Sequence, residues 1–331
     1  MKKARICLFG AGRMAQDHAQ NIYDSPYADL VGIVDPLDSA AQKMAEIYKC
    51  KIYPSATEVF ADANIDGLAI VSPSHTHSEL ILNASAAGKG IFCEKPIDLD
   101  VGKIKSCQIA IEESGVPFLL GFNRRFDTHH SSMQERIREG EIGSIEYIHI
   151  TSRDNPCPPL SYIKTSGGLF HDMMIHDFDM ARWLLNEEIS EVYTMGACLM
   201  EPELAEFSDV DTACVTLKSV SGRICSINNS RRSVYGHDQR IEVFGSEGML
   251  QSENVNPTYV RKFSKSGVET DKPLQRFLDR YKNAYKNEME HFLRDVMNDS
   301  PAKVSAYDGY QANLIADAAK KSYLESRPIS I

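Results

Sequence analysis

Hydrophobic residues in the first 120 positions follow two alternating periods. Short apolar runs of the kind found in buried parallel strands occupy residues 4–10, 30–34, 66–71, 90–93 and 116–120. Stretches with helical character lie between them, at residues 12–23, 39–49, 75–87 and 100–114. Strands and helices that alternate with short links predict an α/β fold, a doubly wound parallel Rossmann sheet.

Two of these helices begin beside residues that favour helix starts. Asp38 is a candidate cap for the helix at 39–49, and Asp98 or Asp100 for the helix at 100–114. Aspartate favours this position because its side chain accepts hydrogen bonds from the first free N–H groups of a helix.

The pattern changes beyond residue 121. Helical periodicity covers 124–140 and 170–185, a long strand covers 145–153, and a proline-rich loop covers 154–166. Strand candidates then follow one another without helices, at residues 192–200, 212–218, 223–229, 239–244, 249–252 and 258–263. Helices at 277–297 and 307–326 end the chain. This order predicts a C-terminal α+β domain on a large, mostly antiparallel sheet, and we expect domains at 1–121 and 122–331.

Composition narrows the class of protein. Of the 331 residues, 43% are hydrophobic and 25% are charged, so the chain is not disordered as a whole. A net charge of −10 argues against nucleic acid as the main partner. No apolar run approaches the ~20 residues of a membrane span, and the apolar start is too short for a signal peptide. We therefore expect a cytoplasmic protein with neither a nucleic-acid nor a membrane partner.

Cysteine and histidine spacing does not suggest a metal site. No two of the eight cysteines have the two-residue gap of zinc knuckles, so we interpret them as reduced core residues. His75 and His77 are two residues apart, and His129 and His130 are adjacent, but neither pair has carboxylate or thiolate partners at ligand spacing. We therefore expect no bound metal ion.

A glycine turn after the first strand has the position of a dinucleotide-binding loop. Gly10 permits a tight turn, and Gly12 lets the backbone approach a pyrophosphate at the start of the next helix. Asp35 ends the second strand, 25 residues after Gly10, where an acid would bind the adenosine ribose. Because a carboxylate repels a 2′-phosphate, this pattern favours NAD over NADP; the alternative is a purely structural turn.

Two further segments carry candidate chemistry. Lys95 directly follows the strand at 90–93, at the ligand-binding end of an open α/β sheet, although a solvated surface lysine is the other interpretation. Asp172, His176 and Asp179 are spaced to share one helix face. A carboxylate beside an imidazole suits acid–base work, and an exposed polar face is the alternative.

Together these residues resemble the Gfo/Idh/MocA oxidoreductases. The shared features are the glycine turn, Glu94-Lys95-Pro96, and an Asp and a His four apart after a glycine pair. The segments at 121–127, 151–154 and 162–182 look like those of the inositol 2-dehydrogenases within that family. The resemblance spans essentially the whole chain, and it implies NAD-dependent oxidation of myo-inositol to 2-keto-myo-inositol.

The resemblance also assigns roles to particular residues. It implies that Lys95, Asp172 and His176 are catalytic: the lysine bonds the reacting hydroxyl, the histidine takes its proton, and the acid positions both. It implies cofactor contacts at Gly10, Gly12, Arg13, Met14, Asp35, Ser72, His77, Glu94, Lys95 and Asn123. The polyol pocket would contain Lys95, Arg125, Asp154, Asp172, His176 and Tyr235, although plain salt bridges for Arg125 and Asp154 and a strand-end role for Tyr235 remain open.

Two alternatives to this interpretation stay open. A sibling enzyme could act on scyllo-inositol or another cyclic polyol, or on an aldose. A non-catalytic NAD-binding sensor could keep the fold, although a sensor has no need of Lys95, Asp172 and His176 together.

Because alternate positions on the second-domain strands are apolar, we also expect a homotetramer or dimer through the outer sheet face.

Overall fold

The computed structural model describes residues 3–298 and 303–331. The chain forms two compact units, Met1–Phe126 with Ala284–Gln311, and Asp127–Asn283 with Ala312–Ile331. The first unit thus contains a stretch from the C-terminal third of the sequence. The domain boundary expected at 121/122 stays a prediction.

The first unit is built on a parallel sheet with the strand order β3-β2-β1-β4-β5-β6. Its strands are β1 (Ala4–Phe9), β2 (Ala28–Val34), β3 (Lys51–Ile52), β4 (Gly67–Ile70), β5 (Gly90–Cys93) and β6 (Phe118–Leu120). Neighbouring strands pair in parallel, as in doubly wound nucleotide-binding folds. The predicted Rossmann sheet is therefore confirmed. The short exposed β3 was not predicted, because two residues carry no periodic signal.

Four helices of the first unit follow the predicted positions closely, and the helix at Ala56–Ala61 was not predicted. The helices are α1 (Arg13–Asp24), α2 (Asp38–Tyr48), α3 (Ala56–Ala61), α4 (His77–Ala86) and α5 (Val101–Ser114), with the short turns η1 (Ser74–Thr76) and η2 (Asn123–Phe126). Asp100 caps α5 by accepting from the N–H groups of Gly102 and Lys103, as predicted. The prediction that Asp38 caps α2 is wrong, because Leu37 holds that position and Asp38 is already helical.

The core of the first unit includes side chains from far along the sequence. Ile6, Leu8 and Phe92 from the strands pack in one cluster with Met289 and Phe292. The last two belong to α9 (Phe277–Asn298), whose residues from Ala284 onward lie in this unit. Part of the predicted C-terminal helix pair therefore completes the hydrophobic core of the nucleotide-binding sheet.

The second unit contains a sheet with the order β12-β11-β7-β10-β9-β8-β15. Its strands are β7 (Ile145–Arg153), β8 (Ile189–Ala197), β9 (Thr212–Ser219), β10 (Ile224–Ser230), β11 (Asp238–Gly245), β12 (Gly248–Ser252) and β15 (Ile329–Ser330). Among its described pairs, β7–β10 is parallel and the others are antiparallel, so the predicted sheet type is confirmed.

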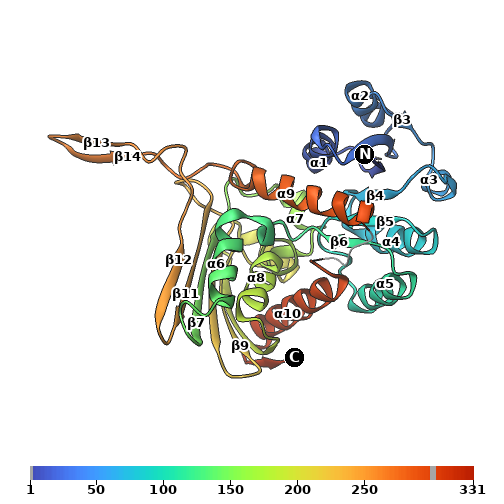
Figure 1. Cartoon of the computed structure of the whole chain (residues 1–331). Coiled ribbons are helices and arrows are strands. Elements are labelled where there is room, and N and C mark those ends of the chain that lie inside the picture. Colours follow the sequence, from blue (N-terminus) through green and yellow to red (C-terminus); the bar gives the residue numbers. More distant parts are fainter. Residues whose placement is uncertain (1–2, 299–302) are drawn as a thin grey trace. The chain divides into compact units, whose positions relative to one another are not determined.

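The predicted strand at 258–263 does not join this sheet. Instead β13 (Arg261–Ser264) pairs with β14 (Gly267–Thr270) in a separate hairpin that extends away from the rest of the second unit (Figure 1). Apolar and charged residues alternate here, which the sequence pattern cannot distinguish from a strand of the main sheet.

Helices cover one face of the second sheet. They are α6 (Thr128–Arg138), α7 (Leu160–Ile163), α8 (Ile175–Leu185) and α10 (Ala306–Glu325), with η3 (Leu169–Met173) and η4 (Pro202–Phe207). Phe178 and Leu184 of α8 and Ile315 of α10 pack against buried strand residues, and Phe170, Met173 and Ala181 are buried in the same cluster. The short α7 lies inside the segment predicted to be a loop throughout.

The opposite face of the sheet carries exposed apolar side chains. Tyr193 and Met195 on β8, Ile224 on β10 and Phe244 on β11 are all exposed, while their neighbours along each strand are buried. Alternation of this kind is the mark of a sheet with one face packed on a core.

Two expectations about the chain as a whole can be compared with the structure. All eight cysteines lie in described residues and all are free; Cys7, Cys93, Cys107 and Cys225 are buried. Across residues 3–298 and 303–331, no helix combines the length and the apolar character that crossing a bilayer requires.

A histidine and two glutamates meet in the interior of the first unit. The Nε2 atom of His18 lies 2.7 Å from Oε1 of Glu94, and Glu288 lies in the same buried group. Burial opposes ionisation of Glu94, but the His18 hydrogen bond and the charges of His18 and Lys95 lower its pKa overall. Burial and the nearby charge of Glu94 raise the pKa of Glu288 well above its ordinary value. Glu288 is therefore the protonated member of the group.

We expect Glu288→Gln to stabilise the protein increasingly as pH rises from 5 to 8. The folded-state pKa of Glu288 is raised, so wild type loses stability as pH rises above the unfolded-chain pKa, by at most about 1.4 kcal/mol per pH unit. Glutamine does not titrate. Melting temperatures of both proteins across this range test the prediction, with Glu290→Gln on the same helix as the control. A pH-independent difference for Glu288→Gln would show that the carboxyl is already ionised.

Candidate functional site

The loop between β1 and α1 has the geometry of an anion-binding turn. Gly10 has φ +103°, and a Cβ there would lie 2.7 Å from the carbonyl oxygen of Val71. At Gly12 a Cβ would meet no described atom within 4 Å, so the fold itself does not require glycine there. No side chain of the described residues caps α1, and its first turn holds no acidic residue. The N–H groups of the first turn of α1, which have no acceptor within the helix itself, and the open space at Gly12 fit a dinucleotide pyrophosphate.

Asp35 anchors this loop as well as ending β2. Its Oδ2 accepts a hydrogen bond from the N–H of Ala11 at 2.7 Å, and its Oδ1 accepts from the N–H of Leu37 at 2.8 Å. Each carboxylate oxygen has a second lone pair. The carboxylate therefore lies against the glycine turn and keeps acceptor capacity for a ribose diol.

His77 connects two of the predicted cofactor segments. Its Nε2 lies 2.7 Å from the carbonyl oxygen of Ser72 and its Nδ1 lies 2.8 Å from the carbonyl oxygen of Pro96. Burial lowers the pKa of His77, and the two carbonyl contacts offset this only in part. Because both ring nitrogens contact backbone carbonyls, this side chain holds the Ser72 and Lys95-Pro96 segments together. The hydroxyl of Ser72 lies 2.6 Å from that of Thr76.

Glu94 and Lys95 directly follow β5. Glu94 contacts His18 through one oxygen and accepts from the N–H of Lys95 through the other at 3.2 Å. Lys95 is half-buried. The carboxylate thus fixes the backbone that carries the lysine.

Asn123 and Arg125 follow β6. Asn123 is buried, and its Nδ2 has no hydrogen-bond partner within residues 3–298 and 303–331. An unmade bond at a buried amide fits a ligand that supplies an acceptor, such as a nicotinamide carboxamide. Arg125 donates to Asp308 at 2.8 Å. The salt bridge considered for Arg125 is present.

In the second unit, a glycine pair and an aspartate start the segment that carries Asp172 and His176. Gly168 has φ +79°, and a Cβ there would lie 2.6 Å from Oδ1 of Asp209. That oxygen accepts from the N–H of Leu169 at 2.8 Å, so Asp209 caps the turn. The predicted single helix is interrupted: η3 is a π-helical turn, closed by a hydrogen bond from Met174 N–H to Leu169 C=O, and α8 follows. Such turns are frequent at functional sites.

Asp172 lies between a phenol and a guanidinium. Tyr162 Oη donates to its Oδ1 at 3.0 Å, and Nη1 of Arg231 lies 3.4 Å from its Oδ2. Asp172 and His176 are half-buried, whereas Asp179 is almost fully buried at 1% exposure. The predicted polar stripe is therefore limited to Asp172 and His176, because Asp179 faces the interior.

Asp154 and Tyr235 are held by neighbours on the same sheet. Oδ1 of Asp154 lies 3.4 Å from Nδ1 of His237. Burial opposes ionisation of Asp154, but His237 and, more weakly, Arg231 lower its pKa overall. The hydroxyl of Tyr235 accepts from Arg153 at 2.8 Å and donates to Asp238.

Some contacts at these sites were not predicted from the sequence. They involve His18, Glu288, Asp209 and Arg231. Each lies far in sequence from the residue it supports, and none belongs to a short motif. Tyr162, which contacts Asp172, and Arg153, which contacts Tyr235, stood in segments that the sequence singled out.

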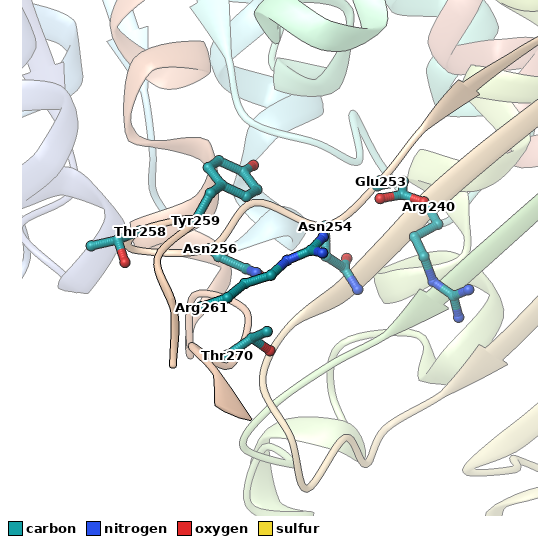
Figure 2. A pocket seen from close by; sticks show the side chains of 8 residues that line it. All are labelled: Arg240, Glu253, Asn254, Asn256, Thr258, Tyr259, Arg261 and Thr270. Carbon is teal, nitrogen blue, oxygen red and sulfur yellow. The ribbon is translucent and has the colours of Figure 1, made fainter. Parts of the chain in front are cut away.

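A polar cavity of about 430 Å³ lies elsewhere on the second unit. Figure 2 shows its lining, with the Arg261 side chain extending from the β13–β14 hairpin toward Asn254 and Asn256. As the described residues define it, the cavity contains no predicted site residue. Arg240, one of the two arginines in its lining, is already paired with Asp238 at 2.7 Å.

Both parts of the chain match models of one protein family. Residues 4–122 match the Gfo/Idh/MocA model described as an oxidoreductase family with an NAD-binding Rossmann fold, and residues 134–331 match that of the family's C-terminal alpha/beta domain. The chain is 42% identical over 328 residues to an inositol 2-dehydrogenase of Rhizobium meliloti strain 1021, covering 99% of each chain.

Two further relatives extend the comparison. A scyllo-inositol 2-dehydrogenase (NAD(+)) of Bacillus subtilis strain 168 is 36% identical over 331 residues, covering 99% of this chain and 96% of that protein. The crystal structure of a myo-inositol dehydrogenase from Corynebacterium glutamicum ATCC 13032 superposes with a TM-score of 0.95 at 41% identity, covering 100% and 99% of the two chains. This protein therefore belongs to the Gfo/Idh/MocA oxidoreductases, with an N-terminal NAD-binding Rossmann domain and a C-terminal α/β domain.

Proposed function

We propose that this protein is an inositol 2-dehydrogenase that oxidises myo-inositol to 2-keto-myo-inositol in inositol catabolism, with NAD as the hydride acceptor. The observation that carries the proposal is 42% identity to an inositol 2-dehydrogenase over nearly the full length of both chains. The glycine turn, Asp35 and the buried amide of Asn123 support the cofactor.

Three side chains would perform the chemistry. His176 accepts the proton of the reacting hydroxyl. Lys95, on a backbone fixed by Glu94, stabilises the developing alkoxide by its positive charge, which in such sites is often the largest contribution. Asp172, held by Tyr162 and Arg231, positions the other two. NAD held at the glycine turn would supply the hydride acceptor.

The remaining predicted residues would shape the two binding sites. Gly10, Gly12, Arg13 and Met14 would hold the pyrophosphate, and Asp35 would bind the ribose. The nicotinamide side would be held by Ser72, Glu94 and Asn123. His77 would support two of these loops through its contacts with the carbonyl oxygens of Ser72 and Pro96. Asp154 and Tyr235 line the polyol pocket. Arg125 would line the same pocket while it donates a hydrogen bond to Asp308.

A second candidate substrate is scyllo-inositol, because the 36% identical Bacillus subtilis relative carries that name. The two isomers differ in the orientation of one hydroxyl, so the pocket and not the catalytic set decides between them. A panel of inositol isomers and aldoses, assayed for NADH with NAD and with NADP, separates the candidates. Absence of turnover on every member, in a folded NAD-binding protein, would favour the sensor alternative.

We also propose that the enzyme works in the cytoplasm as a homotetramer or dimer. The free and largely buried cysteines fit a reducing compartment. The exposed apolar residues on the outer face of the second sheet form a surface that self-association would cover.

Asp35→Ser should raise the KM for NAD by roughly tenfold or more and reduce the preference for NAD over NADP. The serine cannot accept two hydrogen bonds from a ribose diol as a carboxylate does, and it no longer repels a 2′-phosphate. Initial rates with both cofactors test this. Asp29→Ser on the same strand, where Asp29 bonds the exposed Lys3, should leave both constants unchanged. Unaltered constants in Asp35→Ser would remove Asp35 from the ribose site.

His176→Ala should lower kcat by roughly 10²–10⁴-fold while NAD affinity stays near wild type, since a positioned acid–base group is lost. The kcat of Lys95→Ala should fall by a comparable factor. The loss of kcat in the double variant should be far smaller than the product of the two single losses. His129→Ala, at an exposed histidine, is the control. A kcat within about threefold of wild type in His176→Ala contradicts the assigned role.

Met195→Glu should reduce the assembled protein to single chains. Met195 is 66% exposed on the outer sheet face, and a buried charge there would oppose association. Val220→Glu, at an equally exposed turn, should leave the mass unchanged. Light scattering at micromolar concentration measures both. A wild-type particle with the mass of one chain would refute the proposed assembly.

A further inference from the structure

A buried arginine lies between two carboxylates of the proposed polyol pocket. Arg231 follows β10 and is 1% exposed. Its backbone N–H donates to the carbonyl oxygen of Asp211 at 2.9 Å, which fixes the start of the side chain. The guanidinium places Nη1 3.4 Å from Asp172, and its charge lowers the pKa of Asp154.

The other edge of this guanidinium has no protein acceptor. Nε and Nη2 of Arg231 are both buried, and neither has a hydrogen-bond partner in the described chain. These two groups point their N–H bonds from the same edge of the planar guanidinium, as a two-pronged donor. A charged donor pair left unpaired in the interior is costly, so a native protein keeps one where a ligand supplies the acceptors.

Arg182 shows what this edge does when the protein satisfies it. Arg182 is 6% exposed in the same unit, and its Nε and Nη2 donate to the two carboxylate oxygens of Glu188 at 2.7 and 2.6 Å. The same edge of Arg231 has no such partner, although it is buried more deeply. The difference marks the Nε–Nη2 edge of Arg231 as a buried donor pair that the described protein does not satisfy.

We infer that the Nε–Nη2 edge of Arg231 binds two adjacent hydroxyl oxygens of the polyol substrate. This inference rests on the proposed function. A vicinal diol fits better than a carboxylate, because Asp172 and Asp154 already place negative charge beside the guanidinium. Hydroxyl groups also donate, so the diol that accepts from Arg231 can donate to these carboxylates. Arg231 is thus a specificity-determining residue for the arrangement of hydroxyls around the ring.

Arg231→Lys tests the inference, because it keeps the positive charge beside Asp172 and removes the two-pronged donor. We would measure kcat/KM for myo-inositol and for its monodeoxy analogues, each lacking one hydroxyl other than the reacting one. For myo-inositol we expect a loss of roughly 10–100-fold. For an analogue that lacks one of the two hydroxyls bound by Arg231, we expect the same substitution to lower kcat/KM by less than about threefold. Two analogues should behave in this way, and the hydroxyls that they lack should be at adjacent ring positions.

If the lysine variant misfolds, the measurement is repeated with Arg231→Gln. Arg182→Lys is the matched control, and any fall in kcat/KM that it causes should be the same for all substrates. NAD affinity should stay near wild type in each variant. Equal losses for every analogue in the Arg231 variants would overturn the inference and leave Arg231 as a support for Asp172 alone. Wild-type enzyme that turns over no polyol would instead refute the proposed function, and the diol contact with it.

Discussion

Parallel pairing of buried strands is the constraint on which the nucleotide-binding unit depends. The last residues of β1, β4, β5 and β6 are paired in register: Phe9, Ile70, Cys93 and Leu120. Backbone bonds continue this alignment by one residue, from Val71 to Phe9, Glu94 to Ile70 and Gly121 to Cys93. Segments far apart in sequence therefore leave the sheet at one edge. The glycine turn, the Ser72 loop, Glu94-Lys95 and the Asn123 segment are neighbours for that reason.

Buried polar side chains then fix the loops that the sheet brings together. Asp35 holds the glycine turn, His77 joins the Ser72 and Pro96 carbonyls, and Glu94 holds the Lys95 backbone. The second unit uses the same device, since Asp209 caps the turn that leads to Asp172. His77 and Asp209 are buried, and Asp35 and Glu94 are half-buried; hydrogen bonds offset the hydration that these groups lose. Loops with few apolar contacts gain a defined shape in this way.

Buried charges in this protein differ in how far the chain satisfies them. Arg182 and Glu188 satisfy each other, and Glu288 avoids its cost by remaining protonated beside Glu94. Arg231 contacts Asp172 through one nitrogen and keeps an unpaired edge. A polyol presents many similar hydroxyls, so its recognition requires donors and acceptors that the protein itself leaves unused. The unpaired edge of Arg231 provides such donors beside the carboxylates.

Local patterns in the sequence were sufficient for most strands and helices of both units, though not for the short β3, α3 and α7, and for the motifs that lie within a few residues of each other. The period of the apolar residues determines which face is buried, and glycine at Gly10 is required by a local backbone angle. Tertiary structure alone decided which distant residues support the motifs: Glu288 beside Glu94, Asp209 at Leu169, and Arg231 at Asp172. It also decided that Phe292 completes the core of the N-terminal sheet and that residues 261–270 form a separate hairpin. These contacts depend on packing between segments distant in sequence, and periodicity records only whether a residue is buried, not which residue it packs against.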